Sequence, residues 1–269
     1  MLYFRKDGMT TMIFSKSIKE FTKEWKEDIK KRINPKDPPI LGIVQVGENP
    51  ASTRYVNNKI KDCDEVGIDV RPLYLPEDVS MDDFYNAFAI LRHNVDGIIV
   101  QLPLPPQLDI EEIKKWIPAD KDVDGFLTDS PFDPCTPGGI IKYLDYCNFD
   151  LEGKNVVIVG RSNIVGKPLA RMMTDRNATV TLCHSHTRNV YDFYYTADLI
   201  VSAVGKPKFL NCYPIYVPVV DVGINFVDGK LVGDCINTEN RDVTPVPGGV
   251  GLLTRCMLLE NVTRAAYER

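Results

Sequence analysis

The chain has 269 residues, of which 44% are hydrophobic and 26% charged, with a net charge of −5 at pH 7. These values are typical of an ordinary globular protein with one large domain or two of modest size. The slightly negative charge excludes a general attraction to nucleic acid or to anionic membranes, so neither is an expected partner.

Cysteine usage and the N-terminus narrow the class of protein further. The seven cysteines are scattered without a Cys-x-x-Cys pair. This pattern favours neither a disulfide framework nor a zinc site, and no metal is expected. The stretch MLYFRKDGMTTMIF lacks the apolar core of a signal peptide, and no apolar run reaches the roughly 18 residues of a membrane span. We therefore expect a cytoplasmic protein with reduced thiols.

The first part of the chain alternates between helical and strand-like patterns. An amphipathic helix presents Ile18, Phe21, Trp25 and Ile29 on one face. Strands are then expected at 39–47, 69–75 and 96–104, and helices at 51–66, about 80–93 and about 109–116. Such alternation predicts βαβ units around a parallel sheet.

A connection rich in Pro, Gly and Asp follows at 118–139, and its length and composition indicate a functional segment rather than a passive linker. The alternation restarts after a helix at about 138–147. The expected elements are strands at 155–160, 178–185, 198–205 and 217–224, helices from about 166 and at 190–196, and a terminal helix after 244–251. This pattern predicts a second α/β unit.

Tyr55 and Lys59 lie one helical turn apart, at the edge of the apolar face formed by Val56, Ile60 and Cys63. Such an edge can border a cleft. A lysine beside an apolar stripe is more often a solvated head on a buried stem, so the pair alone leaves both a structural and a functional role open.

The turn GRSNIVGKPLA at the restart indicates nucleotide binding. Gly160 closes the strand and Gly166 begins the next helix, so backbone N–H groups and the helix dipole are free to hold a pyrophosphate. The loop reads GxSxxxG where the usual fingerprint is GxGxxG. A glycine-closed turn without a ligand therefore stays open as an alternative.

The end of the next strand distinguishes between cofactors. A protein that binds NAD usually has Asp or Glu there for the ribose 2′-hydroxyl, whereas this chain reads CHSHTR at 183–188. A serine, two histidines and an arginine of this segment (Ser185, His184, His186 and Arg188), together with Arg161 and Lys167 of the turn, suit a 2′-phosphate, so NADP is the expected cofactor. The two histidines at 184 and 186 are equally consistent with surface residues and lack the spacing of a metal site.

Eight segments carry a more specific signal because they occur together and in order. They are SxxYVxxKxKxC at 52–63, DGIIVQLPLP at 96–105, DKDVDGF at 120–126, PCTPGG at 134–139, VIVGRSNIVGKP at 157–168, VTLCHSHT at 180–187, DVGIN at 221–225 and TPVPGGVG at 244–251. On these segments the chain resembles, from about residue 39 to its C-terminus, the bifunctional methylenetetrahydrofolate dehydrogenase/methenyltetrahydrofolate cyclohydrolase family.

The resemblance implies a catalytic set of four residues. In the family, the lysine that matches Lys59 is the acid/base, and the tyrosine that matches Tyr55 packs against the folate. The match to Gln101 is a glutamine that hydrogen-bonds near the lysine, and the match to Asp124 holds the pterin ring. Alternatively, Gln101 is a loop residue whose amide only hydrogen-bonds nearby backbone. Asp122 is expected to form a turn or to cap a helix.

The same resemblance implies two groups of binding residues. Expected folate contacts are Ser52, Tyr55, Asp124, Pro247, Gly248 and Gly249, where the two glycines let the backbone approach a ligand closely. Expected cofactor contacts are Gly160, Arg161, Ser162, Ser185 and Ile224, together with Gly166 of the turn.

The predicted fold is α/β with two lobes and the active site in the cleft between them. The first lobe, 1–145 completed by 245–269, would bind folate, and the second, 146–244, would be a Rossmann-like NADP-binding domain. The implied reactions of one-carbon metabolism are NADP-dependent oxidation of 5,10-methylenetetrahydrofolate to 5,10-methenyltetrahydrofolate and its hydrolysis to 10-formyltetrahydrofolate, which serves purine biosynthesis. The resemblance also implies a homodimer.

The chain departs from the family at two places. It reads PGGVGLLT where most members read PGGVGPMT, so Leu252 replaces a proline and puts folate affinity in question. The N-terminal region has another sequence but keeps the amphipathic helix. Two other functions stay open: a monofunctional NAD- or NADP-dependent dehydrogenase of another small substrate, and a non-catalytic nucleotide-binding module.

Overall fold

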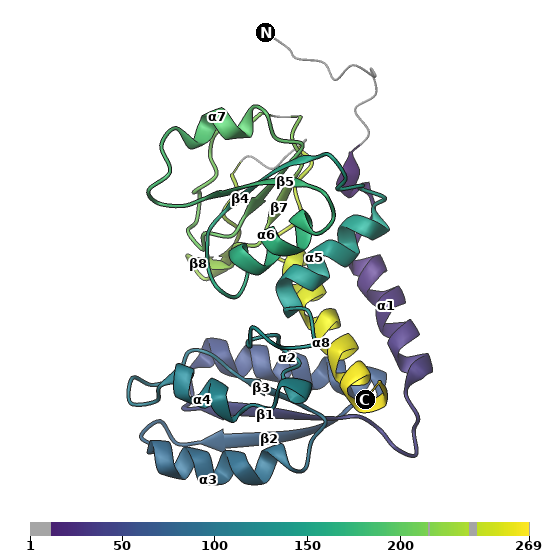
Figure 1. Cartoon of the computed structure of the whole chain (residues 1–269), viewed down its shortest axis with the longest axis vertical. Helices are drawn as coiled ribbons and strands as arrows, with labels where there is room; N and C mark the ends of the chain where they lie inside the picture. Colours follow the sequence, from purple (N-terminus) through teal and green to yellow (C-terminus); the bar gives the residue numbers. More distant parts are fainter. Residues whose placement is uncertain (1–11, 215, 237–240, 269) are drawn as a thin grey trace. The chain divides into compact units, whose positions relative to one another are not determined.

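The computed structural model of the chain describes residues 12–214, 216–236 and 241–268. Packing divides the chain into two compact units (Figure 1). Within the described residues, the first unit comprises 23–135 and 255–268, and we call it the Lys59 unit. The second comprises 12–22 and 136–254, and we call it the Gly160 unit. Residues 1–11, which the predicted first lobe includes, lie outside the described residues.

The Lys59 unit is built on a parallel sheet of three strands. Strands β1 (Ile40–Val46), β2 (Asp69–Leu75) and β3 (Gly97–Val100) lie in the order β2-β1-β3. In the register, Leu41 of β1 lies opposite Val70 of β2 and Gly97 of β3. The central strand β1 is buried along almost its whole length, as its continuous apolar run predicts, whereas the edge strand β2 is partly exposed.

Helices cover both faces of this sheet. Figure 1 shows α2 (Pro50–Val66) and α3 (Met81–Arg92) on opposite faces. The hydroxyl of Ser80 caps α3 by accepting a hydrogen bond from the Asp83 N–H at 3.1 Å. Phe84 and Phe88 of α3 pack with apolar residues of β1, β3 and α4 (Ile110–Trp116) in one buried cluster.

The Gly160 unit contains a parallel sheet of four strands. Strands β4 (Asn155–Val159), β5 (Thr179–Cys183), β6 (Leu199–Ser202) and β7 (Val219–Asp221) lie in the order β5-β4-β6-β7. Alternate residues of β4 enter two buried clusters, one with Ile158, Leu169 and Met173, and the other with Val159 and Tyr194. The helices of this unit are α5 (Cys135–Tyr146), α6 (Gly166–Thr174) and α7 (Val190–Tyr194). Because all four strands are parallel, their carboxyl ends lie along one edge of the sheet.

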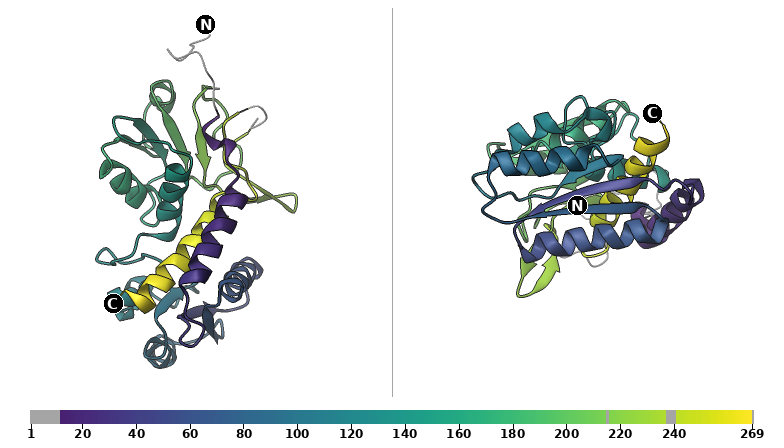
Figure 2. Two further views of the ribbon diagram at one scale, coloured as in Figure 1. Left: turned by 90° about the vertical axis from the view of Figure 1, so that its right-hand side faces the viewer. Right: turned by 90° about the horizontal axis from the view of Figure 1, so that it is seen from below.

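Two long helices come from the ends of the described chain. Figure 2 shows α1 (Ile18–Arg32) alongside α8 (Val250–Tyr267). In the Lys59 unit the two helices are joined by the indole N–H of Trp25, which donates to Glu260 at 2.9 Å. The predicted apolar face of α1 is confirmed, since Ile18, Trp25 and Ile29 are buried and Phe21 packs against the core of the Gly160 unit.

The boundaries of the two units differ from those predicted for the two lobes. Packing divides the chain after residues 22, 135 and 254, whereas the sequence suggested divisions after 145 and 244. The reason is that Ile140, Ile141 and Leu144 of α5 lie in the same buried cluster as the second sheet. The division into folate- and NADP-binding lobes, and the cleft expected between them, stay predictions.

The predicted order of helices and strands is confirmed, and so is the α/β fold class with parallel sheets. The prediction lacked two short 3-10 helices, η1 (Ile13–Ser15) and η2 (Ala119–Lys121), and an antiparallel hairpin of β8 (Asn225–Val227) and β9 (Lys230–Val232). Its turn is Asp228-Gly229, with φ of 50° and 74°, which is the strongest short-range signal for such a hairpin. Among the described residues, no helix is long and apolar enough to cross a membrane.

Candidate active site

Lys59 and Gln101 meet at the carboxyl end of β3. Lys59 lies in the middle of α2, and its Nζ donates a hydrogen bond to Oε1 of Gln101 at 3.2 Å. Gln101 directly follows β3, and its N–H donates to the Val44 carbonyl at 2.8 Å, which extends the pairing with β1. Both side chains are half-buried. Parallel α/β sheets bind their ligands at this end of the strands, so the pair is placed where a substrate is expected.

The amide of Gln101 is held in one orientation. Its Nε2 donates to the Leu102 carbonyl at 2.7 Å, which turns Oε1 toward Lys59. The hydroxyl of Ser52, which is 4% exposed, donates to the same carbonyl at 3.4 Å. Gln101 therefore satisfies local backbone and holds the lysine at once, so the two interpretations made from the sequence are compatible.

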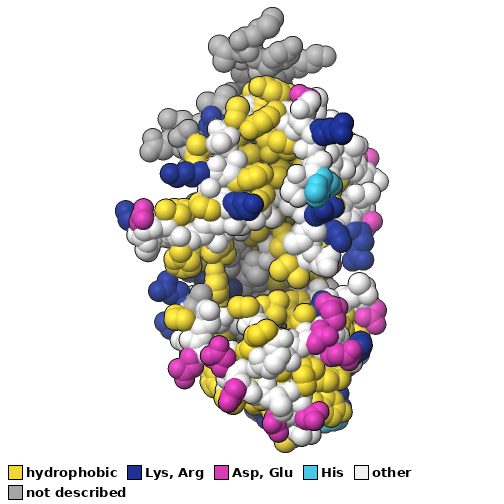
Figure 3. Space-filling model, turned by 90° about the vertical axis from the view of Figure 1, so that its left-hand side faces the viewer, with side chains coloured by type: hydrophobic (Ala, Val, Ile, Leu, Met, Phe, Trp, Pro, Cys, Tyr) yellow, Lys and Arg dark blue, Asp and Glu magenta, His cyan; other side chains and the backbone are white. Residues whose placement is uncertain are grey.

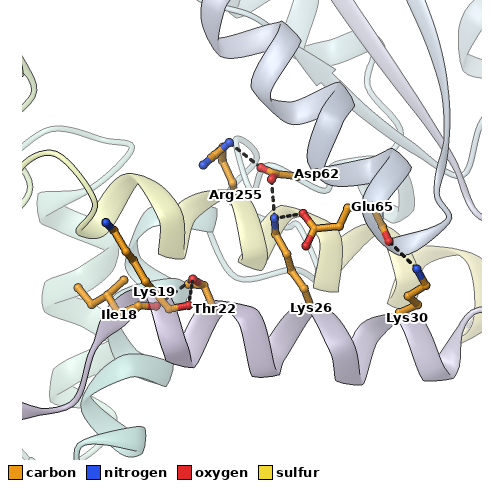
Figure 4. Close-up of polar contacts among 8 residues, drawn as sticks. All are labelled: Ile18, Lys19, Thr22, Lys26, Lys30, Asp62, Glu65 and Arg255. Carbon is orange, nitrogen blue, oxygen red and sulfur yellow. Dashed lines mark hydrogen bonds and ion pairs between the residues drawn. The ribbon is translucent and has the colours of Figure 1, made fainter.

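Ion pairs hold the helix that carries Lys59. Figure 4 shows Lys26 of α1 beside Asp62 and Glu65 of α2, with Nζ at 2.6 Å from each carboxylate. Arg255 of α8 contacts the other oxygen of Asp62 at 2.8 Å. Asp62 is only 6% exposed, so these contacts fix the position of α2 more firmly than surface ion pairs do.

Tyr55 lies one turn before Lys59 on α2 and is half-buried. Burial raises the pKa of its phenol, and the positive charge of Arg54 opposes this effect. The phenol is therefore protonated at neutral pH.

Asp124 lies in a loop that its neighbour Asp122 shapes. The Asp122 carboxylate accepts hydrogen bonds from the N–H groups of Phe126 at 3.1 Å and Leu127 at 2.8 Å, so the predicted turn-forming role is confirmed. Gly125 has a φ of 71°, and a Cβ there would lie 2.6 Å from Pro134 Cα. The conformation around Asp124 is therefore tightly restricted.

Asp124 and Lys59 both act on one buried thiol. Burial, and then the negative charge of Asp124, raise the pKa of Cys135 well above its usual value, while the positive charge of Lys59 opposes them. The thiol itself donates to the Val123 carbonyl at 3.3 Å, next to Asp124. The structure thus brings Lys59, Gln101 and Asp124 into the same part of the Lys59 unit.

In the Gly160 unit, the predicted phosphate turn depends on its two glycines. Gly160 has a φ of 120°, and a Cβ there would lie 2.2 Å from the Ala203 carbonyl oxygen. A Cβ on Gly166 would lie 1.9 Å from the Gly160 carbonyl oxygen. No larger residue fits at either position without moving backbone, so the turn has the close strand-to-helix approach of a dinucleotide-binding site.

Ser162 caps the helix that follows this turn. Its Oγ accepts hydrogen bonds from the N–H groups of Val165 at 3.2 Å and Gly166 at 3.3 Å. Arg161 and Ser162 are both exposed. The turn therefore presents the Arg161 guanidinium to solvent, which suits a phosphate group, while the first N–H groups of α6 are bonded to Ser162 within the turn.

Ser185 follows β5 and is exposed, three residues before Arg188. Partial desolvation, and then the charge of Arg161, lower the pKa of His184, so the turn and the end of β5 are electrostatically coupled. Figure 3 shows Lys and Arg side chains gathered near a histidine on one face of the molecule. The two histidines belong to no metal-binding group among the described residues.

The remaining predicted residues are also in the Gly160 unit. Ile224 is 41% exposed after β7, and Pro247, Gly248 and Gly249 directly precede α8. The structure therefore divides the predicted folate contacts, with Ser52, Tyr55 and Asp124 in the Lys59 unit and 247–249 in the other. Leu252, which replaces the family proline, packs half-buried against the core of the Gly160 unit.

Comparison with known proteins decides the family. The family model of the catalytic domain of tetrahydrofolate dehydrogenase/cyclohydrolase matches residues 14–124, and that of the NAD(P)-binding domain of the same enzymes matches residues 134–269. The chain belongs to the tetrahydrofolate dehydrogenase/cyclohydrolase family. The resemblance seen in the sequence is thus confirmed.

Individual relatives support the assignment over almost the whole chain. A bifunctional protein FolD of Sulfurihydrogenibium sp. is 46% identical, with 86% of this chain and 87% of that protein covered. The crystal structure of the bifunctional FolD of Campylobacter jejuni is 38% identical, with a TM-score of 0.88 and 94% and 98% coverage. The Trypanosoma brucei FolD, solved with NADP and an inhibitor, is 28% identical, with a TM-score of 0.87 and 94% and 97% coverage.

Proposed function

We propose that this chain oxidises 5,10-methylenetetrahydrofolate with NADP to 5,10-methenyltetrahydrofolate and then hydrolyses that product to 10-formyltetrahydrofolate. The observation that carries the proposal is the hydrogen bond between Lys59 and Gln101 at the carboxyl end of β3, with Asp124 nearby. The relatives named as bifunctional FolD support both activities.

On the folate side, we assign binding to Tyr55, Asp124 and Ser52. The ring of Tyr55 would pack against the folate, and the Asp124 carboxylate would accept paired hydrogen bonds from the amino group and adjacent N–H of the pterin. Ser52 is mostly buried, and its hydroxyl donates to the Leu102 carbonyl, to which Gln101 is also bonded. Pro247, Gly248 and Gly249 are further proposed folate contacts.

For hydrolysis, we assign proton transfer to Lys59. A water molecule adds to the methenyl carbon, and Lys59, acting as the neutral amine, takes a proton from it and becomes the ammonium that can return it. Opening of the adduct then breaks one carbon–nitrogen bond, leaves a formyl group on the other nitrogen, and requires a proton at the departing nitrogen. Gln101 keeps the amine in place through both transfers, because its own amide is fixed on Leu102.

The structure fits NADP as the hydride acceptor of the oxidation. Gly160 and Gly166 leave a cradle that a Cβ would fill, and the helix N-terminus behind it suits a pyrophosphate. Arg161, Ser162 and Ser185 would hold the phosphates, and Ile224 would contact the cofactor. NADP, when bound, supplies the chemistry of hydride acceptance, and the protein contributes orientation and exclusion of water.

Two alternatives are less favoured. A monofunctional dehydrogenase of another small substrate gives no reason for Lys59, Gln101 and Asp124 to lie together, and a non-catalytic nucleotide-binding module gives none either. A homodimer and a place in purine biosynthesis rest on the resemblance alone. Cytoplasmic location rests on the scattered cysteines and on the sequence pattern of the N-terminus. Light scattering of the purified protein tests the dimer.

The test of the proposed function uses two separate assays on the purified chain. Methylenetetrahydrofolate with NADP or NAD should give methenyltetrahydrofolate, followed by its absorbance, with NADP preferred. Supplied methenyltetrahydrofolate should be hydrolysed without any nucleotide. Absence of turnover with both cofactors in the first assay would contradict the proposed dehydrogenase activity. Hydrolysis at the uncatalysed rate in the second would contradict the proposed cyclohydrolase activity.

A further inference from the structure

Two buried aspartates of the Gly160 unit carry a hydrogen-bond network of their own. Asp221 ends β7 and is 2% exposed, and Asp234 follows β9 and is fully buried. The Asp234 carboxylate accepts five hydrogen bonds: from Ser202 Oγ at 3.0 Å, Asn225 Nδ2 at 3.1 Å, and the N–H groups of Val204 at 2.9 Å, Gly205 at 3.2 Å and Lys206 at 2.9 Å.

Asp221 supports Asp234 from the other side. Its carboxylate accepts hydrogen bonds from the N–H groups of Asp234 at 3.0 Å, Gly223 at 2.9 Å and Cys235 at 2.9 Å. A Cβ on Gly223 would lie 2.2 Å from the Asp234 carboxylate. The backbone thus approaches both carboxylates as closely as glycine allows.

This network holds two segments at the carboxyl edge of the sheet. The first, 204–206, follows β6, and the second, 223–225, follows β7. Burial of a carboxylate is costly unless hydrogen bonds compensate for the lost water. Nearly all the donors to the two carboxylates belong to these two segments or to the chain around Asp234. The carboxylates therefore mainly hold loops in place.

Both segments adjoin the proposed cofactor site. Ala203, next to the first segment, donates its N–H to the Val159 carbonyl at 2.8 Å, and its own carbonyl faces the Cα of Gly160 so closely that no Cβ fits between. Ile224 lies within the second segment, between two residues that bond the aspartates. A shift of either segment therefore moves a proposed cofactor contact.

We propose that Asp234, oriented by Asp221, is a positioning residue for the bound nicotinamide nucleotide. It sets the segment beside the Gly160 turn and the segment that carries Ile224 without touching the cofactor itself. The inference rests on the proposed function, in which these two places bind NADP. Asparagine in place of Asp234 would turn an NH2 group toward backbone N–H donors and loosen both segments.

The test compares Asp234→Asn with Asp242→Asn in both assays. Asp242 lies in the same unit and accepts hydrogen bonds from the N–H groups of Ile13 and Phe14, outside this network, so it controls for loss of a loop-binding carboxylate. Asp234→Asn should raise the KM for NADP at least about tenfold, as expected for the loss of charge-assisted hydrogen bonds. Hydrolysis of supplied methenyltetrahydrofolate, which needs no nucleotide, should stay within about twofold of wild type.

A second variant keeps the inference testable if Asp234→Asn does not fold. Ser202→Ala removes only one donor to Asp234 and should raise the KM for NADP by a few fold while hydrolysis is unchanged. Two results in a folded variant would overturn the inference. One is an unchanged KM for NADP, and the other is a loss of hydrolysis as large as the loss of NADP-dependent oxidation. Calorimetric titration measures the Kd of NADP for wild type and for each folded variant without turnover. It therefore tests the role of Asp234 even if the chain does not catalyse the proposed reactions.

Discussion

At the residue scale, we expect the choice between NADP and NAD to depend on Arg161 of the Gly160 turn and on Ser185 after β5. Arg161→Ala together with Ser185→Ala should raise the KM for NADP much more than the KM for NAD, because both are proposed to meet the 2′-phosphate. A charge-assisted contact at such a site is worth on the order of 1.5–3 kcal/mol. Steady-state kinetics with the two nucleotides measure the ratio. Equal effects on both would refute the assignment, and Arg176→Ala, an exposed arginine of the same unit paired with Asp145, should change neither.

Asp122 gives a pH-dependent contribution to stability. Burial raises the pKa of its carboxyl to about 6, although the N–H groups of Leu127 and Phe126 oppose the shift. The folded state thus holds this proton more tightly than the unfolded chain. The contribution of Asp122 to the free energy of unfolding should therefore fall as the pH rises from about 4 to about 6 and stay constant above that.

Asp122→Asn isolates this effect. The difference in free energy of unfolding between wild type and variant should change between pH 4 and 6, with the wild type relatively more stable at the acidic end. Urea unfolding at several pH values measures it, with Asp129→Asn, an exposed residue of the same loop, as the control. Parallel pH curves for wild type and Asp122→Asn would show that the shift in pKa is absent.

At the scale of elements, α8 fixes the loop that carries Asp124. Asn261 of α8 is fully buried, and its Nδ2 donates to the carbonyls of Val123 and Asp133, both at 2.9 Å. Asn261→Leu should raise the KM for both folate substrates by about 5- to 50-fold, since two buried hydrogen bonds are lost, and leave the KM for NADP unchanged. Thr263→Val removes a buried hydroxyl of the same helix that bonds only Leu259 within α8, and should be near neutral.

A double-mutant cycle separates positioning from general destabilisation. If Asn261 acts through Asp124, the effect of Asn261→Leu on the folate KM should largely vanish in the Asp124→Ala background. Additive effects would assign Asn261 a purely structural role.

The sequence predicted the elements well because apolar periodicity determines them, as in β1 and α2. It did not predict the contacts that orient the site. Asp234 and Asn261 have no local pattern, since the five donors to Asp234 lie 9 to 32 residues away and the carbonyls that accept from Asn261 lie 128 and 138 residues away. The β8–β9 hairpin could have been found from Asp228-Gly229, but its strands are too short to show alternation.

At the scale of the whole molecule, the proposed function divides its residues between the two units. Lys59, Gln101 and Asp124 belong to one unit, and the Gly160 turn, Ser185 and Ile224 belong to the other. In the proposed function, hydrolysis uses Lys59, Gln101 and Asp124 without any nucleotide, whereas oxidation also uses the proposed cofactor residues. The proposed folate contacts 247–249 lie in the Gly160 unit. Sequence alone could assign these roles through the resemblance, but the lobe boundaries depend on how α1, α5 and α8 pack, which no local pattern specifies.

The most direct test of this account is the rate of hydrolysis of supplied methenyltetrahydrofolate by Lys59→Met, with Lys61→Met as the matched control on the exposed side of α2. Loss of the proton carrier should lower the rate by a factor of about 100 to 10,000, while some NADP-dependent oxidation remains because hydride transfer depends mainly on orientation. Lys61→Met should behave as wild type in both assays. Wild-type hydrolysis by Lys59→Met, or loss of hydrolysis in Lys61→Met, would contradict the role given to Lys59.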